Sequence, residues 1–168
     1  MHAGELIASD WCGRRANAED LPNAWSLMAQ VMDPEVPVVS LVDLGIVRDI
    51  LFQDGRLKVV LTPTYSGCPA TEMIKQRVRQ ALECAGYATP YLEQRLAPAW
   101  SSQWITDLGR QRLLDYGIAP PQEKSGPVPC PQCASLDTET VSEFGSTACK
   151  ALYRCRRCKE PFDYFKCI

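Results

Sequence analysis

Two pairs of closely spaced cysteines near the C-terminus are the strongest chemical signal in the chain. Cys130 and Cys133 form one C-x2-C pair, and Cys155 and Cys158 form the other. Two such pairs facing each other supply the four thiolates that a tetrahedral zinc ion requires. Because protein ligands then fill every position, we expect a closed, structural zinc site. A four-thiolate iron ion or a cluster is the alternative, since ligand softness alone does not separate these metals.

The cysteines also divide the chain into parts. The last 39 of the 168 residues hold six of the nine cysteines, and so short a segment buries too little surface to fold without a metal. Four prolines between Pro120 and Pro129 are typical of a semi-rigid linker. We therefore expect a loosely held polar arm over 1–20, a larger domain over 21–119, a linker over 120–129 and a metal-bound module over 130–168.

The metal-bound module has two further cysteines, Cys149 and Cys167. Each can replace a ligand, pair with the other under oxidation, or pack against the module. Three strands are expected between and after the cysteine pairs, at 138–142, 151–154 and 162–166, which together form a minimal ribbon.

Helical and strand patterns alternate in the larger domain. Apolar spacing predicts a helix over 24–31 and a third helix after Trp104. On a second helix, it predicts a buried stripe over 74–85, and Gly86 ends this helix. The buried face of the third helix is expected at Ile105, Leu108, Leu113 and Tyr116. Cys84, late in the second helix, is expected to be buried.

A β-hairpin lies between the first two helices. The Asp54-Gly55 pair separates two β-like runs at 46–52 and 57–62, and Asp-Gly is a strong signal for a tight hairpin turn. A weaker strand is expected at 91–96.

Cys68 is the best candidate for a reactive residue. Pro69 suits the first position of a helix, which places Cys68 at or near the N-cap. A thiol there faces the positive end of the helix dipole and several unpaired amides, which favours the thiolate and makes it a better metal ligand. The alternative is a small buried residue that caps the helix.

Three acidic residues, Asp33, Glu35 and Asp43, surround the start of the predicted sheet. They can serve as metal ligands, as acid/base groups or as turn formers. Turn formation is the default interpretation for Asp33 and Asp43, because each is placed to bond to nearby backbone amides.

Missing motifs narrow the function. The single histidine is His2, so a catalytic triad, a Glu-x-x-His di-iron site and a histidine-rich zinc centre have no ligands. Neither a dinucleotide-binding nor a P-loop glycine motif is present. We therefore do not expect a stand-alone enzyme.

Charge and hydropathy indicate the partners and the compartment. The net charge is −2, and the segment from Lys124 to Ile168 has only seven basic residues against five acidic ones. This balance disfavours binding to nucleic acid. No apolar run is long enough for a membrane span, and the polar first ten residues do not resemble a signal peptide. We expect a protein of the reducing cytoplasm.

The motifs of the larger domain resemble a known family. Asp33-Pro34-Glu35, Asp43-Leu44-Gly45-Ile46-Val47, the hairpin and the segment 62–69 are similar to the domain shared by SufT-like proteins and cytosolic iron-sulfur targeting factors. The appended ribbon, with the segments 144–150 and 160–167, resembles the PaaD family of the bacterial phenylacetate-degradation pathway.

This resemblance implies a fold and site residues. The expected fold class is α/β: a compact SufT-like domain with a small antiparallel or mixed sheet and flanking helices, followed by a four-cysteine zinc ribbon. Cys68 corresponds to the family's reactive cysteine, and Asp33, Glu35 and Asp43 correspond to its acidic motif.

The resemblance also implies a function. The family accompanies a multicomponent phenylacetyl-CoA epoxidase, a di-iron monooxygenase fed by an iron-sulfur reductase. The leading hypothesis is an accessory factor that assists assembly or insertion of an iron-sulfur cluster into this reductase, with Cys68 as a transient cluster ligand. The alternative is a non-catalytic structural subunit that stabilises the oxygenase complex.

Overall fold

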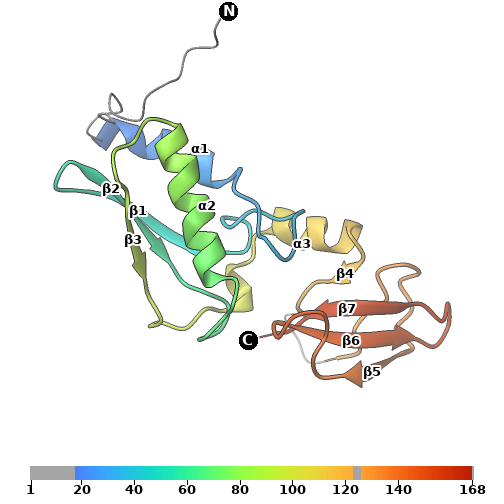
Figure 1. Ribbon diagram of the computed structural model, residues 1–168. Helices are drawn as coiled ribbons and strands as arrows, with labels where there is room; N and C mark the ends of the chain where they lie inside the picture. The colour runs from blue at the N-terminus through green and yellow to red at the C-terminus, as the bar shows by residue number, and fades with distance from the viewer. Residues whose placement is uncertain (1–17, 123–125, 168) are drawn as a thin grey trace, which may run out of the picture.

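The computed structural model describes residues 18–122 and 126–167, which form two units (Figure 1). The α/β unit covers residues 18–117, and the ribbon unit covers 118–122 and 126–167. His2, Cys12 and most of the expected N-terminal arm lie outside the described residues. The end of that arm is a 3₁₀ turn, Ala18–Asp20, in which Asp20 is buried.

The α/β unit is built on a mixed three-stranded sheet in the order β1-β2-β3. Strand β1 (Val47–Gln53) pairs antiparallel with β2 (Arg56–Leu61), and β2 pairs parallel with β3 (Tyr91–Gln94). Asp54 and Gly55 have positive φ angles of 51° and 74°, the conformation that a two-residue hairpin turn requires. The expected hairpin, the weaker strand and the mixed sheet are therefore confirmed.

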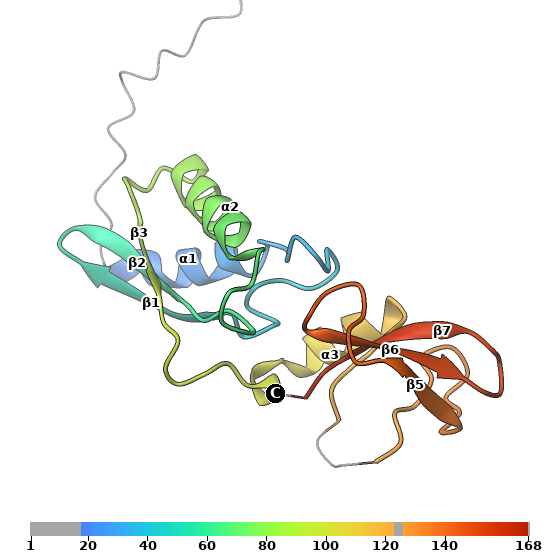
Figure 2. The same ribbon diagram turned by 60° about the horizontal axis from the view of Figure 1, so that its bottom comes forward.

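Two helices pack on this sheet. Helix α1 (Leu21–Met28) contacts both β1 and α2 (Thr71–Cys84), and α2 lies across one face of the sheet (Figures 1 and 2). The α2 residues that face the core are Ile74, Val78 and Leu82. Cys84 is exposed, so its expected burial is wrong: two residues beyond Leu82, it lies on the opposite side of the helix.

The third helix, α3 (Asp107–Asp115), buries only part of the expected face. Ile105 and Leu113 are buried as expected. Leu108 and Tyr116 are 54% and 55% exposed, whereas Gly109 and Leu113 are buried. A β-carbon on Gly109 would lie 2.9 Å from the Asp43 carbonyl oxygen. The glycine thus lets this side of the helix approach the loop, which turns the neighbouring leucine towards solvent.

The ribbon unit contains a four-stranded sheet in the order β4-β7-β6-β5. Three of its strands, β5 (Thr138–Ser142), β6 (Lys150–Cys155) and β7 (Pro161–Phe165), correspond to the predicted ribbon. The fourth, β4 (Ile118–Ala119), pairs parallel with β7. Its two residues are too few to show a strand periodicity, so the predicted ribbon lacks it.

The two units share a hydrophobic core. Phe165 and Cys149 of the ribbon unit are buried in the same apolar cluster as the core of the α/β unit. The Phe165 ring lies 6.0 Å from that of Trp100, whose indole nitrogen donates a hydrogen bond of 2.9 Å to the Leu44 carbonyl. The units therefore bury residues against each other. Within the described residues, no helix has the length and apolar character needed to traverse a bilayer.

Candidate functional site

Cys68 lies in the loop between β2 and α2. Its backbone amide donates to the Tyr65 carbonyl at 3.4 Å, and its own carbonyl accepts from the Thr71 amide at 3.1 Å. The N-cap of α2 is Ala70, so Cys68 lies near the cap, two residues before it, and Pro69 precedes the helix instead of occupying its first position. A turn separates Cys68 from the first residue of α2. Gly67, the residue before Cys68, has a positive φ of 83°. The thiol residue is 9% exposed.

Cys68 faces a small cavity of about 20 Å³ between the two units. This volume has space for roughly one water molecule. Two lining residues, Cys149 and Phe165, come from the ribbon unit, and the others come from the α/β unit. The α/β residues are Asp33, Glu35, Val36, Leu44, Ile46, Pro63, Thr64, Cys68, Ala70 and Ile74. The structure thus brings together two thiols and two carboxylates from distant parts of the chain.

Asp33 and Glu35 lie on the turn after α1. The Oδ1 atom of Asp33 accepts hydrogen bonds from the amides of Glu35 (2.9 Å) and Val36 (2.8 Å), so Asp33 does form a turn. Burial raises the pKa of Asp33 despite these two amides. Burial also raises the pKa of Glu35, and the charge of Asp33 adds to the effect. The wall of the cavity thus holds two carboxyl groups whose charged forms are disfavoured by burial, a penalty that a nearby cation would offset.

Cys149 reaches the cavity from the residue before β6. It is 5% exposed, and the Thr147 hydroxyl lies 3.0 Å from its Sγ atom. Burial raises the pKa of the Cys149 thiol, although the Thr147 hydrogen bond opposes the shift. The charge of Lys150 also lowers the pKa of Cys149. Lys150 is itself buried, and its Nζ atom lies 3.5 Å from Asp163 Oδ2.

Tyr65 is a neighbour of the site that the sequence analysis missed. Burial, the charge of Cys68 and a hydrogen bond to the Cys68 thiol raise the pKa of Tyr65 to about 12. Its position three residues before Cys68 in a turn-rich loop is the one sequence feature that points to it. A neutral phenol beside Cys68 can donate a hydrogen bond to a thiolate there.

Asp43 lies apart from this cavity. Its Oδ2 atom accepts from Arg112 at 2.6 Å and its Oδ1 atom from the Thr106 hydroxyl at 3.1 Å. The Ser40 hydroxyl in turn accepts from the Asp43 amide at 3.0 Å. These contacts join the loop before β1 to α3, so the geometry gives Asp43 a structural position.

The remaining described cysteines outside the ribbon pairs also lie elsewhere. Cys167 is exposed, with its Sγ atom 3.4 Å from the Ser102 hydroxyl oxygen. Cys84 is exposed at the end of α2. Neither residue lines the cavity.

The two C-x2-C pairs come together within the ribbon unit. All four sulfur atoms lie within 4.8 Å of one another. The separations are 3.7 Å between Cys130 and Cys158 and 3.6 Å between Cys133 and Cys155. A tetrahedral ion with bonds of about 2.3 Å separates its sulfurs by about 3.8 Å. The thiols therefore fit a metal of zinc size.

The backbone around the four sulfurs repeats in the two knuckles. Ala134 and Lys159, each following the second cysteine of its pair, have positive φ angles of 58° and 70°. Their amides donate to the carbonyls of Cys130 and Cys155 at 2.9 and 3.0 Å.

Hydrogen bonds, of which that to the Cys158 backbone amide is the largest, lower the pKa of Cys155 to about 6. Although a backbone hydrogen bond at Glu160 opposes the shift, burial and hydrogen bonds to the other ribbon thiols raise the pKa of Cys158 to about 12. Cys155 thus loses its proton readily, as a metal ligand must.

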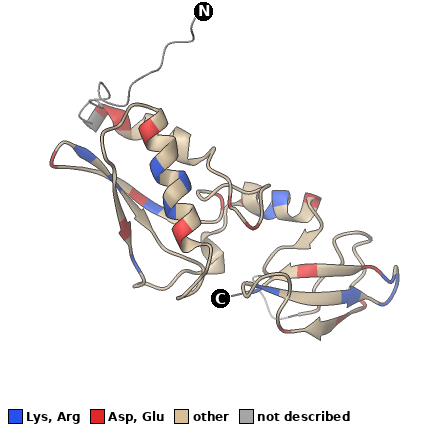
Figure 3. Cartoon of the chain, in the orientation of Figure 1, with Lys and Arg blue, Asp and Glu red and all other residues tan. Residues whose placement is uncertain are grey.

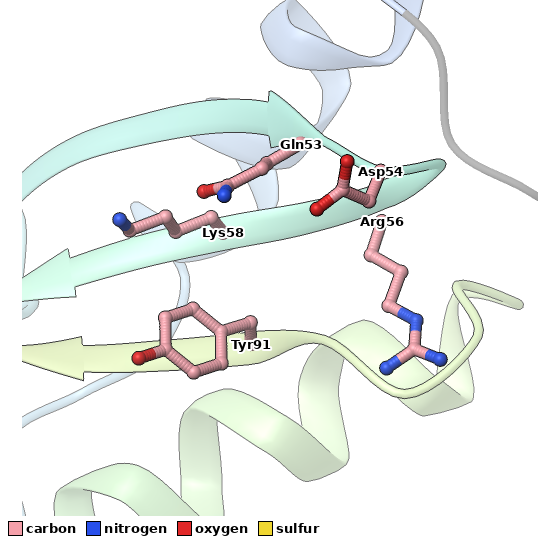
Figure 4. Close-up of a pocket in the computed structure, with 5 residues that line it drawn as sticks. All are labelled: Gln53, Asp54, Arg56, Lys58 and Tyr91. Carbon is pink, nitrogen blue, oxygen red and sulfur yellow. The ribbon is translucent and has the colours of Figure 1, made fainter.

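A wider hollow of about 500 Å³ lies at the hairpin end of the sheet (Figure 4). Figure 4 shows Lys58 and Tyr91 on adjacent strands, with the Lys58 ammonium 5.5 Å from the ring centroid. Lys58 also forms an ion pair with Glu93. The hollow contains no thiol, and its lysine charge is already compensated. Arg56 is a second basic residue that lines the hollow, and Figure 3 shows basic residues on α2 as well as on the hairpin.

The fold and its cysteine sites define a class of protein. Residues 23–87 match the family model described as "Iron-sulfur cluster assembly protein", and residues 119–166 match the "PaaD zinc beta ribbon domain". The chain thus combines an iron-sulfur assembly domain with a zinc-ribbon module.

A curated relative shows the family of the whole chain. An Escherichia coli protein, named as one of the subunits of a "Putative 1,2-phenylacetyl-CoA epoxidase", is 49% identical over 150 residues, which is 86% of this chain and 91% of the relative. The chain belongs to the PaaD family, to which this relative and the ribbon match assign it.

Other relatives lack a counterpart of the ribbon. The "Fe-S protein maturation auxiliary factor" of Bacillus subtilis is 38% identical over 98 residues, which is 57% of this chain but 92% of the relative. A crystal structure of a DUF59 domain from Bacillus anthracis covers 56% of this chain, with a TM-score of 0.52 and 22% identity. This last likeness concerns the fold alone.

Proposed function

We propose that the protein is an accessory factor of a phenylacetyl-CoA epoxidase system that assists assembly or insertion of an iron-sulfur cluster into the reductase component. The relatives named as an epoxidase subunit and as Fe-S maturation factors support an accessory role. In this proposal Cys68 is the transient ligand, the ribbon docks on a protein partner, and zinc occupies the four-cysteine site.

The observation that carries the proposal is the cavity between the units. The buried Cys68 lines this cavity together with a second cysteine and two acidic residues. Soft thiolates bind iron, and the carboxylates favour a cation over an anion. Asp33 and Glu35 act here through their charge, while Asp43 supports the loop from outside the site.

A substitution of Cys68 tests this function in cells. The epoxidase reductase is purified from cells that carry Cys68→Ala and from cells that carry Cys84→Ala, an exposed cysteine in the same unit. We expect the Cys68→Ala cells to yield reductase with less iron and sulfide and slower electron transfer. Normal cluster content in these cells contradicts the proposed role of Cys68.

A structural role in the oxygenase complex is the second candidate. The exposed apolar residues Leu136, Val141 and Phe144 of the ribbon unit favour it, with exposed fractions of 58%, 56% and 68%, because such side chains suit a protein interface. This candidate predicts stable co-purification with the oxygenase and no effect of Cys68→Ala. Co-purification together with normal reductase clusters therefore decides in its favour.

A further inference from the structure

We propose that Cys68 and Cys149 together form a binding site for one thiophilic divalent metal ion, shared between the α/β unit and the ribbon unit. This site deepens the proposed function, because it specifies that the protein carries a single metal ion. The inference rests on that function only for the identity of the ion as iron. Binding itself does not depend on it.

The geometry places both thiols at one cavity. Cys68 comes from the loop before α2 and Cys149 is the residue before β6, and both line the same space of about 20 Å³. They are 9% and 5% exposed. Of the described cysteines, Cys68 and Cys149 line the cavity. The exposed Cys84 and Cys167 lie elsewhere. The ribbon therefore supplies a ligand that the α/β unit lacks.

The charges around the cavity suit a cation. Asp33 and Glu35 line it, and the Asp33 carboxylate is fixed in place by two backbone amides. Lys150 and Arg77 are the cations near Asp33. The Lys150 ammonium lies 3.5 Å from Asp163 Oδ2, and the Arg77 guanidinium donates to the Met32 carbonyl at 3.1 Å. A divalent ion between two thiolates and near two carboxylates gains Coulomb energy that a neutral ligand does not.

The size of the cavity selects one ion over a cluster. A space of about 20 Å³ accepts roughly one water-sized particle, whereas even a cluster of two irons has two sulfides as well. A preassembled cluster therefore fits only if the units separate. A single ion fits between them as they are packed.

The ligand set also differs from that of the ribbon. Of the described residues, only the four ribbon cysteines bring three or more candidate ligand atoms within 4.8 Å of one another. Cys68 and Cys149 thus leave coordination positions for water or for an acceptor's ligand, as exchangeable metal sites do. Two thiolates favour Fe²⁺, Co²⁺ or Zn²⁺ over Mg²⁺ and Ca²⁺.

Binding is a simple ligand exchange. Two thiols release their protons to solvent, two sulfur–metal bonds form, and two water ligands leave the ion. The metal keeps its oxidation state, so the step needs no oxidant or reductant.

Cobalt titration tests the site on the intact chain. Zinc-loaded protein is titrated anaerobically with Co²⁺, and the thiolate-to-cobalt charge-transfer absorption is recorded together with zinc content. We expect one Co²⁺ per chain beyond the ribbon zinc. Cys68→Ser and Cys149→Ser should each weaken binding by at least the roughly 10–100-fold that loss of an outer-shell partner costs. The matched controls Cys84→Ser and Cys167→Ser should bind as the unaltered chain does.

Two results overturn the proposal. One is a zinc-loaded unaltered chain that binds no further Co²⁺, a result that requires no variant to fold. The other is a Cys149→Ser variant that retains its zinc and binds Co²⁺ with unaltered affinity. Cobalt binding with normal reductase clusters in Cys68→Ala cells instead contradicts the proposed cellular function alone. Defective clusters without cobalt binding contradict the shared ion site alone.

Discussion

The two cysteine sites of the molecule differ in where their ligands come from. The ribbon site takes all four thiols from one unit, on two knuckles with matching backbone geometry. The cavity site takes one thiol from each unit and adds carboxylates that lie close by. The first is complete within its own short segment, whereas the second exists only while the units are packed together. Stability and function are thus assigned to different sulfur atoms.

The largest effect is expected at the ribbon site. Cys155→Ser removes one of four ligands, and zinc binding contributes of the order of 10 kcal/mol to the folding of small modules. We expect the variant to lose its zinc and β5, β6 and β7 to unfold. Zinc analysis and amide hydrogen exchange measure both changes. A metal-free variant whose ribbon amides stay protected would show that the module folds without its metal.

The contact between the units gives the next largest effect. Phe165 is 1% exposed and packs on Trp100, so Phe165→Ala should cost about 3–5 kcal/mol of unfolding free energy. It should also open the cavity and speed the alkylation of Cys68, which mass spectrometry measures. The matched control is Phe144→Ala, because Phe144 is 68% exposed. Equal alkylation rates in the two variants would mean that the ribbon does not cover Cys68.

Asp43 tests whether every acidic motif residue belongs to the cavity. Asp43→Ala removes the carboxylate that Arg112 and Thr106 bind and should cost about 1–3 kcal/mol. Cobalt binding at the cavity should stay unchanged. Asp43→Asn keeps an acceptor and should cost less. A stable Asp43→Ala variant with impaired cobalt binding would place Asp43 in the functional site instead.

The smallest effect is a pH dependence of stability at Asp33. Burial raises its folded-state pKa above the ordinary 3.8, so ionisation disfavours the folded state. The neutral carboxyl carries no such penalty below pH 3.8, and the penalty grows as the pH rises through the folded-state pKa. The stability of the unaltered chain relative to Asp33→Asn should therefore fall as the pH rises. Urea unfolding over a pH series measures this difference, and a difference that increases with pH has the wrong sign.

Local signals predicted much of the fold. The Asp54-Gly55 turn and the apolar spacing of α2 depend on neighbours in sequence, and both are seen in the structure. The knuckle spacing likewise predicted the four-sulfur cluster. By contrast, β4 is a two-residue strand that exists only because β7 lies beside it. Apolar spacing did not predict that Leu108 is exposed on α3. The residue of this helix that lies against the Asp43 backbone is Gly109, not a large apolar residue.

The candidate site was predictable only in part. The motif around Cys68 identified one wall of the cavity, and Asp33 and Glu35 line it as well. The sequence did not predict that Cys149 lies at this cavity, because its position depends on the packing of one unit against the other. No periodicity or spacing encodes that contact. Asp43 belongs to the same sequence motif yet bonds to α3, so motif membership did not predict proximity.

The most direct test of the account is the cluster content of the epoxidase reductase in cells that carry Cys149→Ser. The account predicts that this reductase contains less iron and sulfide, as in Cys68→Ala cells, while the variant itself retains its ribbon zinc. Reductase with a full complement of clusters in the Cys149→Ser cells would contradict the claim that the function resides in a site shared by both units.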